Sequence, residues 1–463
     1  MAGPWKKKFA LTGAFLICAA LFLSACSATG KRTTVPPARV LEIEDLRRIP
    51  QDLTGLAGAV GPEVSAGSPC RSHLLGEFAD SFFTPWTSSR PLVDHAESKS
   101  FMARQAKGSW YGVNKRKIAA KQMRELLENC DLDRFPSRDE RAIAVAPGHL
   151  RGLPTVLPFY ERLSDEPFDM LSYPHVKLNE PLRIMHASQD GVWFFVETAY
   201  SNGWLQASEV ALVDDDFIES WMRAPHLVIV RDYAPVADGR RLGAFPAKIG
   251  TILPLSAVTG EEEGWQVMVA SAGEGGRAES RPIRIPRNAA ASFPLAFEQQ
   301  NISLIGNQLL GQPYGWGEVY DLRDCSALLR DFFLPFGIWL PRTSADQIAS
   351  LPKRLQLAAL APQEKKELIK SRGLPLLTLL FKPGHIMLYA GLDREGQPLV
   401  FHAAWSMQVK DKDKNKKRTR ILGGSVITTL EPGKELGLVP GSTLLERATE
   451  MGTITDRCLP RQK

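Results

Sequence analysis

Three residues of this 463-residue chain have the types and spacing that nucleophilic chemistry needs: Cys325, His385 and His402. In the stretch "RDCSALLRDFF" apolar residues recur with a helical period from Cys325, Asp324 stands where an N-cap belongs, and Pro335 ends the pattern. The spacing therefore predicts a helix that begins at Cys325. The unpaired N–H groups and the dipole of a helix start favour a thiolate, so this sulfur is a candidate nucleophile. For a cysteine taken alone, a small buried apolar side chain is the more frequent explanation.

The two histidines lie on predicted neighbouring strands, "HIMLYAG" (385–391) and "PLVFHAAW" (398–405). If a four-residue loop at 393–396 closes this hairpin, His402 faces Met387 and both imidazoles share one face as diagonal neighbours. One imidazole would then accept the thiol proton, and the other would orient it. A shift of one residue in the pairing would place the rings on opposite faces.

The N-terminus predicts export. Residues 1–25 combine basic residues with an apolar run from Phe9 to Leu23, which is the length of a signal-peptide core and too short to span a bilayer. "LSAC" resembles the lipobox of bacterial lipoproteins, which would make Cys26 the lipidated first residue and residues 26–41 a tether; an ordinary signal peptide is the alternative. Ser27 after this cysteine favours the periplasmic face of the outer membrane, by analogy with lipoprotein sorting.

The formal net charge of +6 does not indicate nucleic-acid binding, because "KDKDKNKKRTR" (410–420) alone contributes +5 from seven basic and two acidic residues. Such a run is typical of a solvated loop. Contact with anionic headgroups or wall polymers is a weaker hypothesis for it.

Four cysteines remain once Cys18 and Cys26 are set aside. An exported protein can hold disulfides, and Cys70 with Cys130 is the favoured pair because both lie in the N-terminal region.

The chain divides into regions of different pattern. Residues 42–145 are expected to be helical, with Asn114 capping a helix that runs to Asn129. Short β-type runs follow and occur twice, which predicts two small barrels. We therefore expect an α+β multidomain fold with the following units: 42–145 helical, 146–218 first barrel, 219–291 second barrel, and 292–463 carrying the cysteine helix on an antiparallel sheet.

Several motifs resemble those of the NlpC family of papain-like cell-wall peptidases. They are "GQPYGWGEVYDLRDCSALLRDFFLPFGIWLPRTSADQ" (311–347), "KPGHIMLYAG" and "VFHAAW", and "ETAYSNGWLQASEV" in the first barrel resembles bacterial SH3-like domains. Four positions depart from the family pattern, at Glu318, Arg323, Ala327 and Thr343.

The resemblance implies cleavage of the bond between γ-D-glutamate and a diamino acid in peptidoglycan stem peptides. It makes Cys325 the nucleophile, His385 the base and later acid, and His402 the orienting residue, without a metal or cofactor. In family members with SH3-like domains, the free amine of L-Ala is bound by residues that flank the cysteine and by a barrel tyrosine. The substrate-binding residues implied by the match are Tyr314, Trp316, Asp324, Ser326, Ser344 and, in the first barrel, Tyr200.

Two other functions stay open on the sequence alone. A related Cys-His amidase would cut between N-acetylmuramic acid and L-Ala, and an inert catalytic domain would leave a wall-binding lipoprotein. No HExxH motif is present, and no metal is expected. The identity of the diamino acid, diaminopimelate or lysine, the choice between sacculus and released peptides, and the oligomeric state are not specified.

Overall fold

The computed structural model describes residues 43–57, 64, 67–237, 244–257, 264–410 and 417–459. The predicted signal peptide, Cys26, the tether and residues 411–416 of the basic run lie outside this description. Among the described residues, no helix has the length and hydropathy that a membrane span requires.

The N-terminal helices are divided between two hydrophobic cores. The first helices pack on the C-terminal part of the chain, where α2 contacts β19 and α3 contacts α9. The later helices instead bury Met102, Trp110 and Met123 against Trp204 of the first barrel. The helices before the first sheet are α2 (Glu44–Arg48), α3 (Thr54–Ala57), α4 (Pro69–Phe82), α5 (Thr84–Thr87), α6 (His95–Lys107) and α7 (Ala120–Asn129).

The helix expected from Asn114 begins later than predicted. Lys115 has a left-handed φ of 60°, and the Asn114 side chain accepts the N–H of Arg116, so this segment is a turn. A helix cannot continue through a left-handed residue, and α7 therefore starts at Ala120.

The expected Cys70–Cys130 disulfide is wrong. Cys70, in α4, is bonded to Cys458 near the end of the chain, with 5.0 Å between their Cα atoms. Cys130 is a free thiol, fully buried in the core that α6 and α7 form with the first barrel. The two cysteines of the N-terminal region belong to different cores, which their proximity in sequence does not reveal.

The first barrel is a seven-stranded antiparallel sheet in the order β3-β2-β6-β5-β4-β1-β7. It starts at β1, which pairs with β4 and β7, so the sheet takes in residues before the boundary expected at 146. Its strands are β1 (Glu140–Ala144), β2 (Gly148–Arg151), β3 (Ser172–Val176), β4 (Pro181–Ala187), β5 (Trp193–Glu197), β6 (Asn202–Gln206) and β7 (Val210–Leu212).

The second barrel follows helix α8 (Asp215–Arg223), which crosses the boundary expected between the barrels. Five strands pair in the order β13-β12-β11-β8-β14, and β9 with β10 forms a separate hairpin. These strands are β8 (His226–Ile229), β9 (Ala234–Ala237), β10 (Ala244–Ala247), β11 (Ile252–Ala257), β12 (Trp265–Ala272), β13 (Ala278–Ile285) and β14 (Ala290–Ser292).

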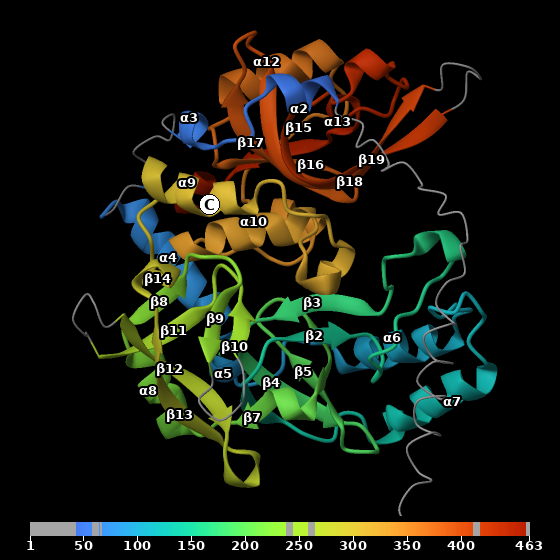
Figure 1. The fold of residues 1–463 in the computed structure, drawn as a ribbon, viewed down its shortest axis with the longest axis vertical. Helices are drawn as coiled ribbons and strands as arrows, with labels where there is room; N and C mark the ends of the chain where they lie inside the picture. Colours follow the sequence, from blue (N-terminus) through green and yellow to red (C-terminus); the bar gives the residue numbers. More distant parts are fainter. Residues whose placement is uncertain are drawn as a thin grey trace, which may run out of the picture. The chain divides into compact units, whose positions relative to one another are not determined.

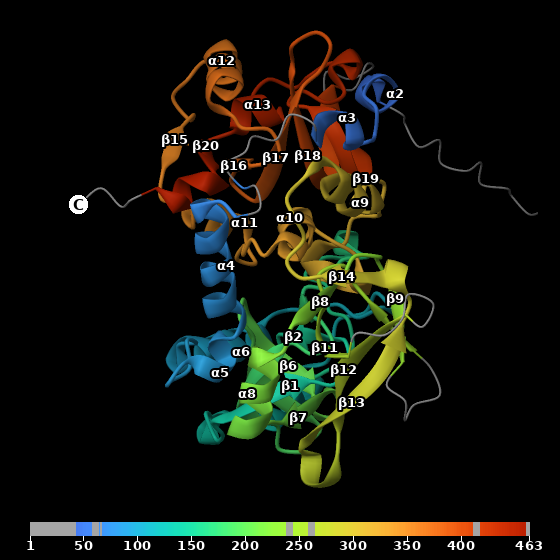
Figure 2. The same ribbon diagram turned by 90° about the vertical axis from the view of Figure 1, so that its left-hand side faces the viewer.

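The C-terminal part is an antiparallel sheet with helices on both faces (Figures 1 and 2). Its strand order is β15-β20-β16-β17-β18-β19. Alternating residues of β17 and β18 enter two cores: Ile386 and Phe401 pack with α10, and Met387 and Val400 pack with α12 and α13. The strands are β15 (Arg354–Gln356), β16 (Thr378–Lys382), β17 (His385–Leu392), β18 (Pro398–Lys410), β19 (Lys417–Thr429) and β20 (Glu450–Thr453). The helices are α9 (Gln299–Leu309), α10 (Cys325–Phe333), α11 (Ser344–Ala349), α12 (Pro362–Arg372) and α13 (Leu444–Arg447).

Candidate active site

The candidate nucleophile is the first residue of α10. Asp324 caps the helix by accepting the N–H of Ala327 at 2.9 Å, as its position predicts. The backbone N–H of Ile386, the residue after His385, acts on the Cys325 sulfur and lowers its pKa slightly, so the sulfur lies near the start of β17. The thiol is 7% exposed.

The expected ionised sulfur is not what this environment favours. Burial raises the pKa of the Cys325 thiol to about 12, and the neighbouring Asp324 carboxylate adds to the rise. Desolvation of the thiolate therefore outweighs the helix start. Burial therefore favours the thiol over the thiolate, and the thiol must lose its proton to a base as it reacts.

The hairpin that carries the histidines has a longer loop than predicted and a bulge in its first strand. At the turn Leu392 pairs with Pro398, and the Asp393 side chain accepts the N–H groups of Glu395 and Gln397, so the loop is a residue longer than expected. A β-bulge between Tyr389 and Gly391 then absorbs the extra residue. Beyond the bulge Leu388 pairs with Phe401, which is the register that puts both histidines on one face.

The two imidazoles form a hydrogen-bonded chain that ends on a threonine. His385 Nε2 lies 2.9 Å from His402 Nδ1, and His402 Nε2 lies 3.0 Å from Thr428 Oγ1. The Thr428 hydroxyl donates its hydrogen to the carbonyl of Thr429 at 2.8 Å, so it accepts from His402. His402 is then protonated on Nε2 and accepts from His385 Nε2–H. The Nδ1 atom of His385 keeps a lone pair, which is what a general base needs.

Lys382 sets the electrostatics of this pair from the neighbouring strand. It lies directly opposite His385 in the register of β16 and β17. Burial lowers the pKa of both histidines, and the positive charge of Lys382 lowers them further, that of His402 to about 3. Both effects favour the neutral form of the rings, in which His385 keeps the lone pair that a general base needs.

Asp324 and Ser326, expected to bind a substrate amine, are already engaged. Arg342 donates to Asp324 Oδ2 at 2.7 Å and to Ser326 Oγ at 2.8 Å, and Ser326 donates to Asp324 Oδ1. The Oδ2 atom of Asp324 also accepts the N–H of Gly317 at 3.2 Å. The carboxylate thus caps the helix and neutralises an arginine at once.

Glu318, one of the departures from the family pattern, is a buried anion among three cations. Its carboxylate lies 3.2 Å from Arg330, 2.9 Å from Arg342 and 3.7 Å from Lys248 of the second barrel. The residue is fully buried and has a left-handed φ of 64°. These cations hold the pKa of the Glu318 carboxyl well below its usual range, against the effect of burial.

Arg323, the second departure, connects the start of α10 to the second barrel. Its guanidinium makes two hydrogen bonds of 2.7 and 2.8 Å to Asp232 and one of 2.8 Å to Asp331. Lys177 of the first barrel lies 2.8 Å from the same Asp331. The departures at Glu318 and Arg323 therefore introduce buried charges into a network of ion pairs, and this network joins both barrels to the segment around Cys325.

Three aromatic rings, those of Tyr314, Phe168 and Trp405, pack together between the catalytic segment and the first barrel. Tyr314 lies within electrostatic range of Cys325, and its ring packs edge-on to Phe168 of the first barrel. Phe168 also packs edge-on to Trp405, with 4.7 Å between ring centroids. Trp316 is 38% exposed, and Ser344 is the first residue of α11. Of these predicted residues, the structure shows only Tyr314 in contact with the thiol's surroundings.

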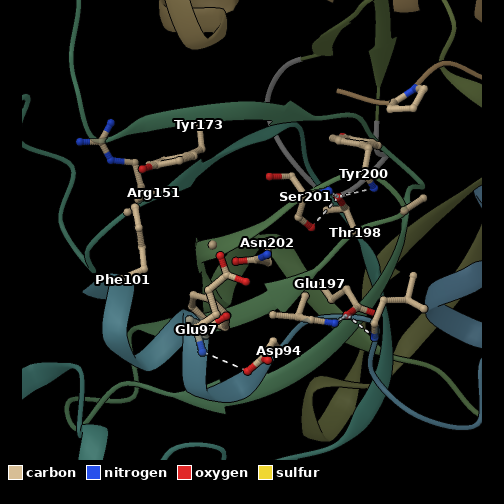
Figure 3. A pocket seen from close by; sticks show the side chains of 18 of the residues that line it. Asp94, Glu97, Phe101, Arg151, Tyr173, Glu197, Thr198, Tyr200, Ser201 and Asn202 are labelled. Carbon is tan, nitrogen blue, oxygen red and sulfur yellow. Dashed lines mark hydrogen bonds between the residues drawn. The ribbon is translucent and has the colours of Figure 1, made fainter. Parts of the chain in front are cut away.

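Tyr200 is not brought to the thiol by any contact in the described part of the chain. Its hydroxyl lies 2.8 Å from the carbonyl of His175 and 2.5 Å from Glu180 Oε2, and Arg330 lies over its ring at 4.2 Å. It borders a cavity of about 590 Å³ between α6, the first barrel and Trp339 (Figure 3). This cavity contains none of Cys325, His385 or His402.

Sequence reasoning missed Phe168, Lys382, Arg342 and Thr428. Lys382 had a local signal, because it stands three residues before His385 and a tight turn would bring them together. Phe168 and Thr428 come from the first barrel and from β19, and only contact between domains or pairing across the sheet brings them to the site. Arg342 lies between α10 and α11, 18 residues after Asp324, and the path of that loop brings it back to the helix start.

Four segments of the chain match known domain families. Residues 15–135 match the N-terminal NLPC_P60 stabilising domain, 158–206 an SH3 domain of the SH3b1 type, and 214–259 an SH3 domain of the SH3b2 type. Residues 311–421, which contain Cys325 and both histidines, match the NlpC/P60 family.

Among solved structures the chain is similar to an NlpC/P60 endopeptidase from Photobacterium damselae subsp. piscicida, with 21% identity and a TM-score of 0.79 over 88% of this chain and 98% of that one. This likeness shows a common fold. An NlpC/P60 family protein from Bacillus cereus ATCC 10987 matches with 15% identity and a TM-score of 0.44 over 68% of this chain and 99% of that one. No curated protein sequence gives a significant match.

Proposed function

This chain belongs to the NlpC/P60 family of cell-wall peptidases, and from that premise we propose that it is a cysteine endopeptidase that hydrolyses the γ-D-glutamyl–diamino acid bond of peptidoglycan stem peptides. The observation that carries the proposal is the hydrogen-bonded chain from His385 through His402 to Thr428 beside a cysteine at a helix start. This arrangement leaves a base with a free lone pair next to a neutral thiol.

The reaction would proceed by acyl transfer. As the Cys325 sulfur attacks the γ-carbonyl carbon, His385 Nδ1 takes the thiol proton, and the carbonyl oxygen becomes an oxyanion. The backbone N–H of Cys325, unpaired at the helix start, would donate to that oxyanion. Collapse breaks the C–N bond, and the imidazolium gives its proton to the departing amine. Water, deprotonated by the same imidazole, then hydrolyses the thioester and releases the acid and the thiol.

Mass-resolved digestion of defined substrates tests this proposal. We expect the wild-type chain to release the diamino acid from L-Ala-γ-D-Glu-diaminopimelate or its lysine analogue, and Cys325→Ala to lose at least about a thousandfold of that activity. Iodoacetamide should abolish cleavage, and EDTA should not. Release of intact stem peptide from N-acetylmuramic acid would identify an amidase instead. Full cellular function of Cys325→Ala would indicate a non-catalytic wall-binding protein.

The proposal includes a preference for stem peptides with a free N-terminal L-Ala. Asp324 and Ser326 offer the ammonium oxygen acceptors, but Arg342 already donates to both. The gain should therefore be about that of one charge-assisted hydrogen bond, of the order of tenfold in kcat/KM over an N-acetylated peptide. Equal rates for the free and acetylated peptides would refute this preference.

We also propose that the protein is exported and lipid-anchored through Cys26, at the periplasmic face of the outer membrane. The motif "LSAC" after an apolar run supports this location. Cys26→Ser should move the processed protein from the membrane fraction to the soluble fraction. Continued sedimentation of that processed variant with membranes would refute lipidation. The SH3-like domains support peptidoglycan as the partner.

A further inference from the structure

Two histidines of the first barrel and one aspartate of the loop before α10 converge outside the catalytic cleft. His149 of β2 and His175 of β3 are direct cross-strand partners. Asp321, four residues before Cys325, points its Oδ1 between them, 2.8 Å from His149 Nε2 and 2.9 Å from His175 Nδ1. These three donor atoms all lie within 4.8 Å of one another.

Hydrogen bonding does not account for all of these contacts. His175 is 3% exposed, and its Nδ1 makes no hydrogen bond within the described residues although it lies beside the Asp321 oxygen. A buried ring nitrogen left in this way has a lone pair or a proton to offer to another group. The cluster therefore brings together one nitrogen of each histidine and one carboxylate oxygen of Asp321.

Two imidazoles and a carboxylate are the donor set that borderline divalent transition metals prefer. Ligand atoms around one tetrahedral Zn²⁺ stand about 3.3 Å apart. Asp321 would therefore retreat by roughly 0.5 Å from each imidazole, and the two imidazole nitrogens, which lie within 4.8 Å of each other, would adjust to the same spacing. Its side chain is 43% exposed and can make that movement.

The cluster is also open to an ion and its water. His149 and Asp321 line a cavity of about 470 Å³, together with Phe245 of the second barrel and Tyr320. Two cations lie around the cluster: Arg151 lines the same cavity and is paired with Asp169, and the Lys248 ammonium acts on His175 and lies 3.7 Å from the Glu318 carboxylate. A divalent ion would therefore meet one anionic ligand, Asp321, near cations that are themselves paired with carboxylates.

We propose that His149 Nε2, His175 Nδ1 and Asp321 Oδ1 form a site for a borderline divalent transition-metal ion such as Zn²⁺, with water in the remaining position. The site is separate from Cys325 and its histidines and goes beyond the proposed peptidase activity. It joins β2 and β3 to the loop that leads into α10, in which Glu318, Tyr320 and Asp321 are held at φ between 59° and 64°. The ion would act as a cross-link between the first barrel and this loop.

Metal titration of the full chain tests the site. The protein carries Cys325→Ala, so that the active-site thiol cannot bind the ion, and is purified in detergent without a polyhistidine tag. We expect one Co²⁺ per chain with visible d–d absorption, displacement by Zn²⁺, and a rise in Tm on Zn²⁺ addition. His149→Gln and Asp321→Asn should each weaken Co²⁺ binding at least about tenfold. His73→Gln, which removes a half-exposed histidine of α4, is the matched control and should leave binding unchanged.

Absence of stoichiometric Co²⁺ binding would overturn the proposal and leave the His149–Asp321 hydrogen bond as a plain contact between barrel and loop. Binding that neither His149→Gln nor Asp321→Asn weakens would overturn it as well, because the ion would then lie elsewhere. Since the tested chain lacks the nucleophile, neither outcome bears on the peptidase activity.

Discussion

At the scale of single residues, the catalytic chemistry depends on where protons are held. The thiol and both imidazoles are buried and neutral at rest, because desolvation disfavours each charged form. Burial thus acts against a preformed thiolate–imidazolium pair. Its reactivity depends on the tautomer of His385, which the residues behind it determine.

Thr428 is the residue that sets this tautomer. Thr428→Val should lower kcat by about 10- to 100-fold with little change in KM, because His402 loses the acceptor for its Nε2–H and no longer holds His385 in one orientation. Thr428→Ser keeps the hydroxyl and should retain most of the activity. Steady-state kinetics on both variants measure the difference; equal activity of the valine and serine variants would contradict the role.

Lys382 determines the pH at which His385 becomes a base. Its positive charge lowers the pKa of the imidazole, so Lys382→Met should raise that pKa. His385 must be neutral to accept the thiol proton, and the acid limb of the kcat/KM profile should move to higher pH by of the order of one unit. Lys353→Met removes an exposed lysine and should leave the profile in place. A shift to lower pH would contradict the assignment.

At the scale of elements, the β17–β18 hairpin positions the histidines through its bulge. The bulge absorbs one residue between the turn and the histidines, so a five-residue loop and the required face are both possible. Gly391 lies in this bulge with φ of 112°, a conformation that residues with a Cβ rarely adopt.

Gly391→Ala should therefore reduce the free energy of unfolding by about 1–3 kcal/mol. The added Cβ would meet nothing closer than 3.9 Å, so the cost is backbone strain alone. Gly76→Ala in α4 is the opposite case, since its Cβ would meet nothing within 4 Å and the residue is helical; it should stabilise the protein by about 0.5–1 kcal/mol. Urea unfolding of both variants measures the change in the free energy of unfolding. A Gly391→Ala protein as stable as the wild type would contradict the strain argument.

At the scale of the whole molecule, buried ion pairs join the segment around Cys325 to both barrels. Glu318 is their central anion, and Glu318→Gln would leave Arg330, Arg342 and Lys248 without it. The free energy of unfolding should fall by about 3–5 kcal/mol at neutral pH. Glu395→Gln breaks an exposed pair with Arg48 and should leave the free energy of unfolding nearly unchanged.

The pH dependence of this contribution has a definite sign. The cations depress the pKa of Glu318 in the folded state, so its stabilisation is present above the unfolded pKa near 4.5 and is lost as the pH falls through the folded value. The difference in denaturation midpoint between wild type and Glu318→Gln should accordingly narrow in acid. A constant difference from pH 7 down to pH 3 would contradict this account.

The sequence by itself determined the elements that carry the chemistry. The period of apolar residues and the Asp324 cap located α10, because capping and periodicity are properties of neighbouring residues. Both histidine strands also formed where their patterns placed them. The α+β architecture with two barrels followed from the same local patterns.

Only the tertiary structure decided which residues pair with one another. The sequence pattern favoured Cys70 with Cys130, whereas the fold places Cys70 beside Cys458, 388 residues away. It likewise brought Thr428 to His402 and Arg342 to Asp324, and it buried Cys325 enough to keep its thiol protonated. Partner choice and desolvation depend on which distant surfaces meet, and no local pattern of residues contains that information.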